Sequence, residues 1–400
     1  MIIPMLRADL DIMPSPVAEQ PGLLIRDSFK YSDAILIIPP PLVQSLVLFD
    51  GTRTDMELQA EITRTFETPE AADLATHLIS ALSKAGFLED ETYVRLKEKK
   101  HSAFAKSRVR QTAHAGSSYP AELELLQATM QKYMDSTDRA EKDLIGIAAP
   151  HISPEGGWRC YGAAYKALTP DLSDRTFVVL GTSHYGQHDK FGLTRKAFKT
   201  PFGKTGIDKK LVDELAAQPA ALMEDYCHVV EHSIEFQVLF LQAIYGPEVR
   251  ILPILCGSFG RHFDEGAYPE DNEGMRRFVE ALGEIAAREK DRLFWVLGVD
   301  MAHMGARYGD HFAAFADRGE MAMVKERDRL RIDRVNASDA RGFWDLVREN
   351  HDDLKWCGSS PIYTFMKAVP QARGTLRRYE QWNIDEQSVV TFAGISFSAP

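Results

Sequence analysis

The sequence has few cysteines and no long run of apolar residues. Four cysteines occur in 400 residues, and none belongs to a Cys-x-x-Cys pair, so a disulfide scaffold and a finger-type zinc site are excluded. No segment reaches the ~18–20 consecutive apolar residues that cross a bilayer. Arg7, Asp9 and Asp11 interrupt the start before a signal peptide can form. We therefore expect a cytoplasmic protein that does not enter a membrane.

The chain also lacks an excess of positive charge. It has 47 Lys and Arg against 58 Asp and Glu, for a net charge of −11, and this balance argues against binding to nucleic acid through a basic surface. Hydrophobic residues make up 44% of the sequence, which excludes disorder for most of the chain. A length of 400 residues favours two domains.

The N-terminal quarter divides into three predicted segments. Residues 1–20 contain three prolines and no periodic pattern, and they predict a flexible arm. Residues 21–95 predict a small winged-helix-like α+β domain. Its expected elements are strands over 23–27 and 34–38 and helices over 42–49, 55–64 and 69–85. The Lys-rich residues 96–110 predict a solvated linker.

Three short motifs lie in residues 21–95: Leu24-Ile-Arg-Asp27, the turn Phe49-Asp-Gly-Thr-Arg-Thr54, and Ala85-Gly-Phe-Leu88. They resemble motifs of the PqqD-like family, whose members are small peptide-recognition domains associated with enzymes that modify ribosomal peptides. The resemblance implies that this module recognises a peptide or protein substrate. The alternative is a generic helical cap.

Residues 111–400 alternate between predicted strands and helices. The strands are expected over 144–149, 176–180, 251–255, 293–297 and 389–397. Most are continuous apolar runs, which strands covered on both faces require. The helices are expected over 121–134, 208–217, 233–244, 275–288, 312–330 and 338–349. This order predicts an α/β fold with a mostly parallel sheet and helices on both faces. Ligands bind beyond the carboxyl ends of such strands.

Histidines follow three of the predicted strands. His151 comes after the strand 144–149, His184 after 176–180, and His303 after 293–297, where Asp300 precedes it. A single strand-end histidine is more often a hydrogen-bonded loop residue than a ligand. Three imidazoles at one edge of a sheet are typical of a divalent metal site.

Two further motifs carry reactive groups. In Glu231-His-Ser-Ile-Glu235 the two glutamates can compensate the dipole of the following helix, or His232 can serve as an acid/base group. Cys357 comes just before a predicted helix with Ser360 at its N-cap, a location that favours the thiolate. Beside two imidazoles Cys357 would be a metal ligand, and without them it is a buried cysteine.

Taken in order, eight motifs from about residue 111 to the C-terminus resemble the Memo family, also called AmmeMemoRadiSam system protein B. They are His114-Ala-Gly-Ser-Ser-Tyr-Pro120, Ala149-Pro-His151, Leu180-Gly-Thr-Ser-His184, Thr200-Pro-Phe-Gly203, Glu231-His-Ser-Ile-Glu235, Ile251-Leu-Pro-Ile254 with Gly257, Asp300-Met-Ala-His-Met-Gly305 and Cys357-Gly-Ser-Ser-Pro361. The resemblance implies a fold similar to the LigB-like class III extradiol dioxygenases.

The same resemblance implies a set of site residues. His151, His184 and Cys357 become the metal ligands, with His232 and His303 near the metal as acid/base or orienting groups. Asp300 joins these candidates, and Glu231 or Asp300 replaces Cys357 if that residue is not a ligand. The implied metal is Fe(II), while a thiolate also suits copper or zinc.

The sequence departs from the family pattern at three places. The segment after His151 is longer than usual, Ser118 stands where a tryptophan is usual, and Tyr185 stands where a second histidine is usual. The first two affect the expected shape of the pocket, and none removes a proposed ligand.

We therefore expect a metal-dependent, non-heme iron dioxygenase-like oxidoreductase that acts on a peptide, protein or small aromatic substrate. The family name suggests radical SAM and AMMECR-like proteins as partners. A non-catalytic scaffold that binds a peptide or sequesters a metal in the same crevice is the alternative. Hydrolysis through Ser183 is a weaker one, because no Gly-x-Ser-x-Gly elbow surrounds it.

Overall fold

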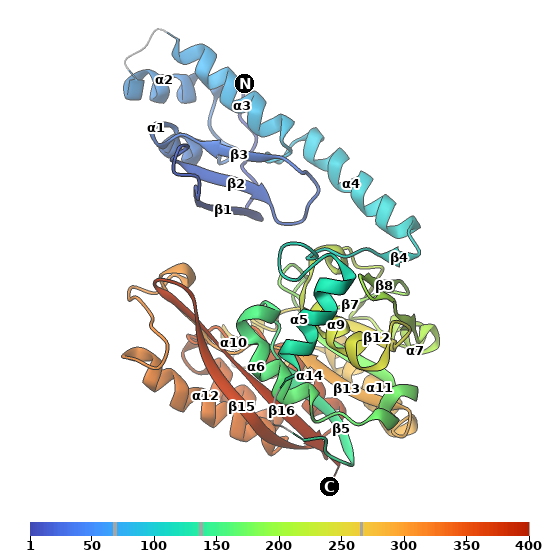
Figure 1. The fold of residues 1–400 in the computed structure, drawn as a ribbon. Helices are drawn as coiled ribbons and strands as arrows, with labels where there is room; N and C mark the ends of the chain where they lie inside the picture. Colours follow the sequence, from blue (N-terminus) through green and yellow to red (C-terminus); the bar gives the residue numbers. More distant parts are fainter. Residues whose placement is uncertain (67–69, 136–138, 265–266, 400) are drawn as a thin grey trace. The chain divides into compact units, whose positions relative to one another are not determined.

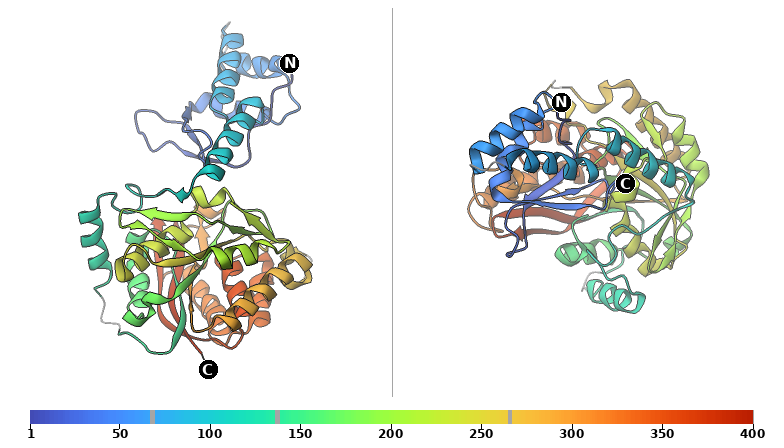
Figure 2. Two further views of the ribbon diagram at one scale, coloured as in Figure 1. Left: turned by 90° about the vertical axis from the view of Figure 1, so that its right-hand side faces the viewer. Right: turned by 90° about the horizontal axis from the view of Figure 1, so that it is seen from above.

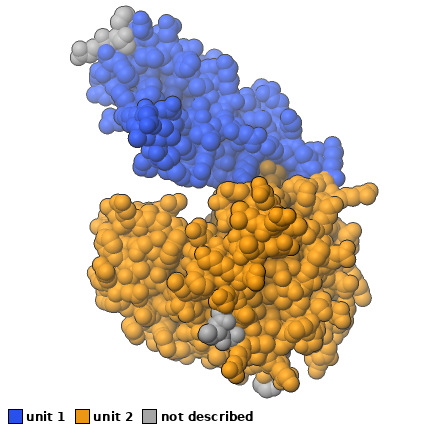
Figure 3. Space-filling view, in the orientation of Figure 1, with its two compact units in different colours: residues 1–106 blue, residues 107–400 orange. Residues whose placement is uncertain are grey.

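A computed structural model describes residues 1–66, 70–135, 139–264 and 267–399. The chain forms two compact units, residues 1–106 and residues 107–400, which Figure 3 shows in different colours. Within the described ranges, every helix is too short or too polar to cross a bilayer.

The first unit is a three-stranded antiparallel sheet covered by helices (Figure 1). Its strands lie in the order β1-β2-β3. The elements are β1 (Leu10–Pro14), β2 (Leu23–Asp27), β3 (Ile35–Ile38), α1 (Pro40–Val43), a 3-10 helix (Gln44–Leu48), α2 (Asp55–Phe66), α3 (Ala71–Lys84) and α4 (Glu91–Lys106). Ile25 from the sheet and Leu58, Ile62 and Leu82 from the helices are fully buried together in its core. The predicted start of the third helix at Pro69 lies outside the described residues.

The predicted arm over residues 1–20 is wrong. β1 pairs with β2, and Ile3 is buried and donates its backbone N–H to the Arg53 carbonyl. The Arg7 guanidinium is buried against the Asp27 carboxylate, 3.0 Å away. Prolines hid this segment because they mark loops, although Pro14 is tolerated at the end of an edge strand.

The predicted linker over 96–110 is also wrong. Residues up to Lys106 continue α4, whose first turn is capped by the Asp90 carboxylate, which accepts N–H groups from Thr92 and Tyr93. Lys and Glu are good helix formers. The charged run that predicted a linker is therefore the exposed part of the helix α4. The next strand, β4 (Val109–Arg110), already belongs to the second unit and pairs with β8 (Ala197–Thr200).

The second unit is built on a ten-stranded sheet with helices on both faces (Figures 1 and 2). Its main path runs β11-β7-β12-β6-β13-β5-β16-β14, with β10 beside β12 and β15 beside β16. The strands are β5 (Leu144–Ala149), β6 (Thr176–Thr182), β7 (Phe191–Leu193), β10 (Gly206–Ile207), β11 (Ala221–Met223), β12 (Arg250–Cys256), β13 (Leu293–Gly298), β14 (His303–Gly305), β15 (Arg373–Asp385) and β16 (Ser388–Ser398). β12, β6, β13 and β5 are parallel neighbours and β16 is antiparallel. The predicted α/β class with a mostly parallel sheet is confirmed.

The main helices of this unit follow the predicted order, with local differences. They are α5 (Leu123–Tyr133), α6 (Pro154–Tyr165), α7 (Lys209–Ala216), α8 (Cys227–Val230), α9 (Ser233–Tyr245), α10 (Arg261–Asp264), α11 (Glu273–Arg288), α12 (Glu320–Asn336), α13 (Ala340–Arg348) and α14 (Ser359–Ala368). The helix predicted over 312–330 begins only at Glu320, because Gly319 precedes it with φ = 53°. The long segment after His151 is the helix α6 rather than a loop.

An interior ion pair fixes α9 to the start of the second unit. Arg110 donates to the Glu235 carboxylate and to the backbone carbonyls of His228 (2.7 Å) and Glu231 (2.8 Å). Tyr119 also donates its hydroxyl to Glu235. Arg110 and Glu235 are both almost fully buried, so each depends on the other for compensation of its charge.

This pair predicts an acid-sensitive contribution to stability. Burial opposes ionisation of Glu235, but the Arg110 charge and the surrounding hydrogen bonds hold its pKa below the usual value. A lowered folded-state pKa contributes stability above the unfolded pKa, about 4.3 for Glu, and the contribution disappears as pH falls through the folded-state pKa. We expect Glu235→Gln to cost about 3–5 kcal/mol at pH 7, because it leaves Arg110 unpaired.

Urea unfolding from pH 7 down to pH 3 checks this prediction. The stability gap between wild type and Glu235→Gln should be constant near neutrality and narrow in acid. A gap that does not change over this range would contradict the ionised pair. Glu273→Gln, at an exposed ion pair with Arg277, is the control and should cost much less.

Candidate metal centre

The carboxyl ends of the central strands deliver the candidate residues to one place. His151 lies two residues after β5, His184 two residues after β6, and Asp300 two residues after β13. Parallel neighbours end at the same edge of the sheet, which explains why these side chains meet. His232 is the residue just before α9, and Cys357 lies just before α14.

Two glycines allow α9 to approach the sheet closely. A Cβ on Gly298 would lie 2.3 Å from the Ser233 carbonyl oxygen, and one on Gly181 would lie 2.5 Å from the Ser233 hydroxyl. The Ser233 hydroxyl donates to the Thr182 carbonyl at 2.7 Å. The start of α9 therefore packs directly against the ends of β6 and β13. This contact places His232, the residue before α9, at the same edge of the sheet.

Three imidazoles form a cluster that could hold a metal ion. His151, His184 and His232 each offer one nitrogen, and these nitrogens all lie within 4.8 Å of one another. The ring centroids are 5.0 Å apart for His151 and His184, 5.3 Å for His151 and His232, and 5.0 Å for the stacked pair His184 and His232. His151 is buried, while about a third of each of the other two side chains is exposed.

Each ring has its Nδ1 close to an oxygen atom, which accepts a hydrogen bond from the rings of His151 and His184. His151 Nδ1 lies 2.9 Å from the Gly298 carbonyl oxygen. His184 Nδ1 and His232 Nδ1 lie 3.0 and 3.2 Å from the same oxygen of Glu231. For His151 and His184 the acceptor at Nδ1 fixes the tautomer and leaves Nε2 with a lone pair, the arrangement that metal-binding histidines usually show.

Glu231 organises this cluster without facing it as a ligand. Its carboxylate accepts the backbone N–H groups of His184 (2.8 Å) and His232 (2.9 Å) as well as the ring of His184, and it lies 3.2 Å from His232 Nδ1. Burial opposes its ionisation, but the neighbouring His184 and its hydrogen bonds hold the pKa of Glu231 far below the usual value. From the sequence we expect Glu231 to compensate the dipole of the following helix or to replace Cys357 as a ligand. Its role as an acceptor for groups of both His184 and His232 could not be expected, because it depends on a tertiary contact with His184.

The electrostatics keep two of the three rings neutral. Burial lowers the pKa of His151 to about 3 and that of His232 well below its ordinary value. Partial burial would lower the pKa of His184 too, but the charge of Glu231 and their hydrogen bond outweigh it and raise the pKa. Neutral imidazoles are the form that binds a metal.

Cys357 lies beside this cluster. Its Sγ is 3.3 Å from His151 Nε2 and 3.8 Å from the Asp300 carbonyl oxygen. Burial and the nearby Asp300 charge raise the pKa of the Cys357 thiol. The sequence predicts that the position of Cys357 before α14 favours the thiolate. In the protein without a metal this prediction is wrong, because burial disfavours the charged thiolate more than the N-terminus of the helix favours it. A bound cation would have to stabilise the thiolate.

Asp300 lies beside both His151 and Cys357, and His303 follows it in the same turn. Asp300 accepts the His151 backbone N–H at 2.9 Å, and its second oxygen is 3.6 Å from His151 Nε2. Burial raises the pKa of Asp300 to about 6. His303 points Nδ1 at the Met301 carbonyl, 2.9 Å away, and burial lowers its pKa to about 4. His303 thus stands next to the three-histidine cluster rather than in it.

A small cavity opens on the cluster between His184 and Cys357. Its volume is about 260 Å³, and hydroxyl groups contribute much of its lining: Thr182, Ser183, Ser258, Ser359 and Ser360. Ser183 Oγ has no hydrogen-bond partner within the described ranges, so no histidine activates it, and the hydrolysis alternative has no support here.

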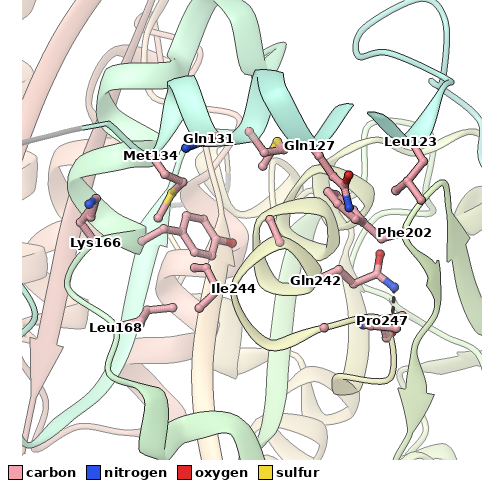
Figure 4. Close-up of a pocket in the computed structure, with 14 residues that line it drawn as sticks. Leu123, Gln127, Gln131, Met134, Lys166, Leu168, Phe202, Gln242, Ile244 and Pro247 are labelled. Carbon is pink, nitrogen blue, oxygen red and sulfur yellow. Dashed lines mark hydrogen bonds between the residues drawn. The ribbon is translucent and has the colours of Figure 1, made fainter. Parts of the chain in front are cut away.

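A larger groove of about 660 Å³ lies elsewhere on the second unit, between α5, the end of α6 and the end of α9 (Figure 4). Its lining includes Leu123, Met130, Met134, Phe202 and Ile244. The figure shows amide and apolar side chains around the space, with Gln242 bonded to Pro247. None of the groove's lining residues is a histidine, a cysteine or a carboxylate, so size does not identify the reactive site.

Comparison with known proteins places these residues in a family context. The family model described as "Memo-like protein" matches residues 110–396. A MEMO1 family protein of Aquifex aeolicus is 28% identical over 385 residues, covering 94% of this chain and 95% of its own. One of Methanosarcina mazei is 26% identical over 293 residues, covering 72% and 98%. One of Pyrococcus abyssi is 29% identical over 263 residues, covering 64% and 85%.

The Aquifex relative matches more than the second unit. An alignment that covers 94% of 400 residues leaves out about 24 of them, so it includes most of residues 1–106. The Methanosarcina relative, at 72%, is matched over a length close to that of the second unit alone.

The shared carboxylate predicts the effect of one substitution. Glu231→Gln keeps the size of the side chain but replaces one carboxylate oxygen by an NH₂ group. This group cannot accept the N–H groups of His184 and His232 that donate to Glu231. We expect metal affinity to fall about 10- to 100-fold, the usual effect of losing the partner of a metal-binding histidine. Titration against a chelator of known affinity measures it, with Glu224→Gln as the matched control. Equal affinity in wild type and Glu231→Gln would refute the orienting role.

Proposed function

The chain belongs to the Memo-like protein family, and on that premise we propose that residues 107–400 form a metal-dependent oxidoreductase. The proposed ligands are His151, His184 and Cys357. The observation that carries the proposal is the cluster of His151, His184 and His232, in which each imidazole offers one nitrogen within 4.8 Å of the others. Cys357 Sγ lies 3.3 Å from His151 Nε2 beside it.

The donor set fits a transition metal. Two donor atoms that bind one ion at ordinary Zn–N and Zn–S lengths lie about 3.5 Å apart, and Cys357 Sγ is 3.3 Å from His151 Nε2. Two imidazoles and a thiolate suit iron, copper or zinc, and we propose Fe(II) from the family resemblance. When bound, such an ion supplies redox chemistry and Lewis acidity at the edge of the small cavity.

The remaining residues handle protons and orientation. His232 is neutral and partly exposed, and its Nδ1 lies 3.2 Å from Glu231. Its role in the proposal is to accept a proton from a substrate bound beside the three histidines. Asp300 and His303 are proposed to hold His151 and the adjoining turn. A cavity of about 260 Å³ admits a small molecule or one side chain of a peptide.

Metal analysis tests the proposal. Protein purified without oxygen should contain about one iron per chain, and His184→Ala should lose it. Cys357→Ser should lose iron as well, whereas His232→Ala should keep iron and lose turnover. If Cys357→Ser retained iron and His232→Ala lost it, His232 rather than Cys357 would be the third ligand. Failure of wild type to bind any metal, even after reconstitution, would favour the non-catalytic peptide-binding scaffold.

We further propose that the first unit presents a peptide or protein substrate, as its resemblance to PqqD-like domains implies. The supporting observation is β3, which ends the sheet order β1-β2-β3 and carries Ile35, a side chain that is 61% exposed. An edge strand can pair with an extended peptide. Radical SAM and AMMECR-like partners stay predictions from the family name.

A peptide-display selection with the full chain tests this role. Ile35→Glu should abolish enrichment of peptides that wild type selects, because it adds charge beside the open edge. Val47→Glu, at a side chain that is 75% exposed outside the sheet, is the control and should select as wild type does. Equal enrichment by both variants would contradict binding at β3.

A further inference from the structure

Three side chains of α12 hold the segment that leads to Cys357. Arg327 forms two bonds to the Asp353 carboxylate, at 2.5 and 2.9 Å. Arg331 bonds to Asp352 at 3.0 Å. Asp328 accepts the Trp356 indole N–H at 2.6 Å, and Trp356 is the residue directly before Cys357. Positions 327, 328 and 331 share one face of the helix.

The segment that they hold is strained. Asn350, His351, Asp352 and Lys355 all have φ between 53° and 55°, a region that costs residues with a side chain energy and persists only where the surroundings enforce it. Asp352 is buried and also accepts the Trp356 backbone N–H at 2.9 Å. The position of Cys357 therefore depends on contacts outside its own segment.

Asp328 adds a side-chain link between this segment and the Asp300–His303 turn, which the backbone bonds from His303 N–H to the Leu354 carbonyl (2.9 Å) and from Gly358 N–H to the Asp300 carbonyl (3.1 Å) also join. Its side chain is fully buried, and it accepts hydroxyl groups from Thr391 and Tyr379, both at 2.7 Å, in addition to the Trp356 indole. Thr391 Oγ1 in turn accepts the Ala302 backbone N–H at 2.8 Å. Ala302 lies in the turn between Asp300 and His303. One carboxylate thus joins the turn of Asp300 and His303 to the approach of Cys357.

We propose that Asp328 is a positioning residue that sets Cys357 and the Asp300–His303 turn against each other through Trp356 and Thr391. The proposal rests on the proposed function in so far as Cys357 serves as a ligand. A carboxylate accepts from all three partners at once. An amide would turn its N–H either toward the indole N–H, which cannot accept, or toward the two hydroxyl groups, which would then have to accept instead of donate. Tyr379 lies on β15, which carries no site residue, so its bond to Asp328 contributes stability alone.

Two measurements on the full chain test the proposal. The first is the rate at which the metal-free protein reacts with a thiol reagent, since Cys357 is the partly exposed cysteine and the other three are buried. The second is the affinity for Co²⁺ together with the near-ultraviolet thiolate-to-cobalt band. Asp328→Asn should speed the thiol reaction about tenfold, weaken Co²⁺ binding about 10- to 100-fold and diminish the band.

Matched variants separate positioning from stability. Tyr379→Phe removes one donor from the same carboxylate and should leave the thiol rate, the Co²⁺ affinity and the band at wild-type values while lowering the urea midpoint. Trp356→Phe removes the indole N–H that Asp328 accepts, together with part of a buried ring. It should reproduce the effects of Asp328→Asn on the thiol rate, the Co²⁺ affinity and the band. It also carries the test if Asp328→Asn does not fold.

Equal thiol rates in Asp328→Asn, Trp356→Phe and Tyr379→Phe would overturn the proposal. A wild-type protein that binds Co²⁺ without a thiolate band would overturn the ligand role of Cys357 instead. In that case the thiol rates of the metal-free variants still decide whether Asp328 positions this cysteine.

Discussion

The candidate metal centre depends on one buried carboxylate, that of Glu231. It accepts hydrogen bonds from the backbone and the ring of His184, at the end of β6, and from the backbone of His232, at the start of α9. A buried negative charge is costly unless donors surround it, and here the donors are the groups whose orientation matters. The contact that stabilises the charge therefore also sets the directions of two imidazoles.

The surrounding fold holds this arrangement from both sides. Gly181 and Gly298 let α9 settle on the sheet, and Arg110 ties the same helix to the first strand of the unit through Glu235. Opposite them, α12 restrains the strained segment before Cys357. The candidate ligands thus sit at the ends of rigid elements, which is where a site can keep its geometry without a bound ligand.

A feature of this structure could be predicted from the sequence where neighbouring residues determine it, and could not where distant residues do. The central strands are continuous apolar runs, so they and the histidines that follow them could be placed from composition and the strand-end rule. The helices α6 and α4 were not predicted. The glycines of α6 and the charged residues of α4 are also typical of loops and linkers. The roles of Glu231 and Asp328 could not be predicted, since their partners are distant in sequence: Asp328 and Thr391 are 63 residues apart. The PqqD-like character of the first unit stays a prediction.

The place of β16 in the sheet has a consequence for biosynthesis. It pairs with β5, β14 and β15, yet it is made some 240 residues after β5. Its Thr391 exchanges backbone hydrogen bonds with Met301 and Ala302, in the turn beside His151. During translation the first unit can fold as it emerges, whereas the turn of the metal centre has no strand to pair with until nearly the whole second unit has been synthesised. A metal ion could therefore meet the finished geometry only once β16 has been made, and an ion met earlier would find histidines that are not yet oriented.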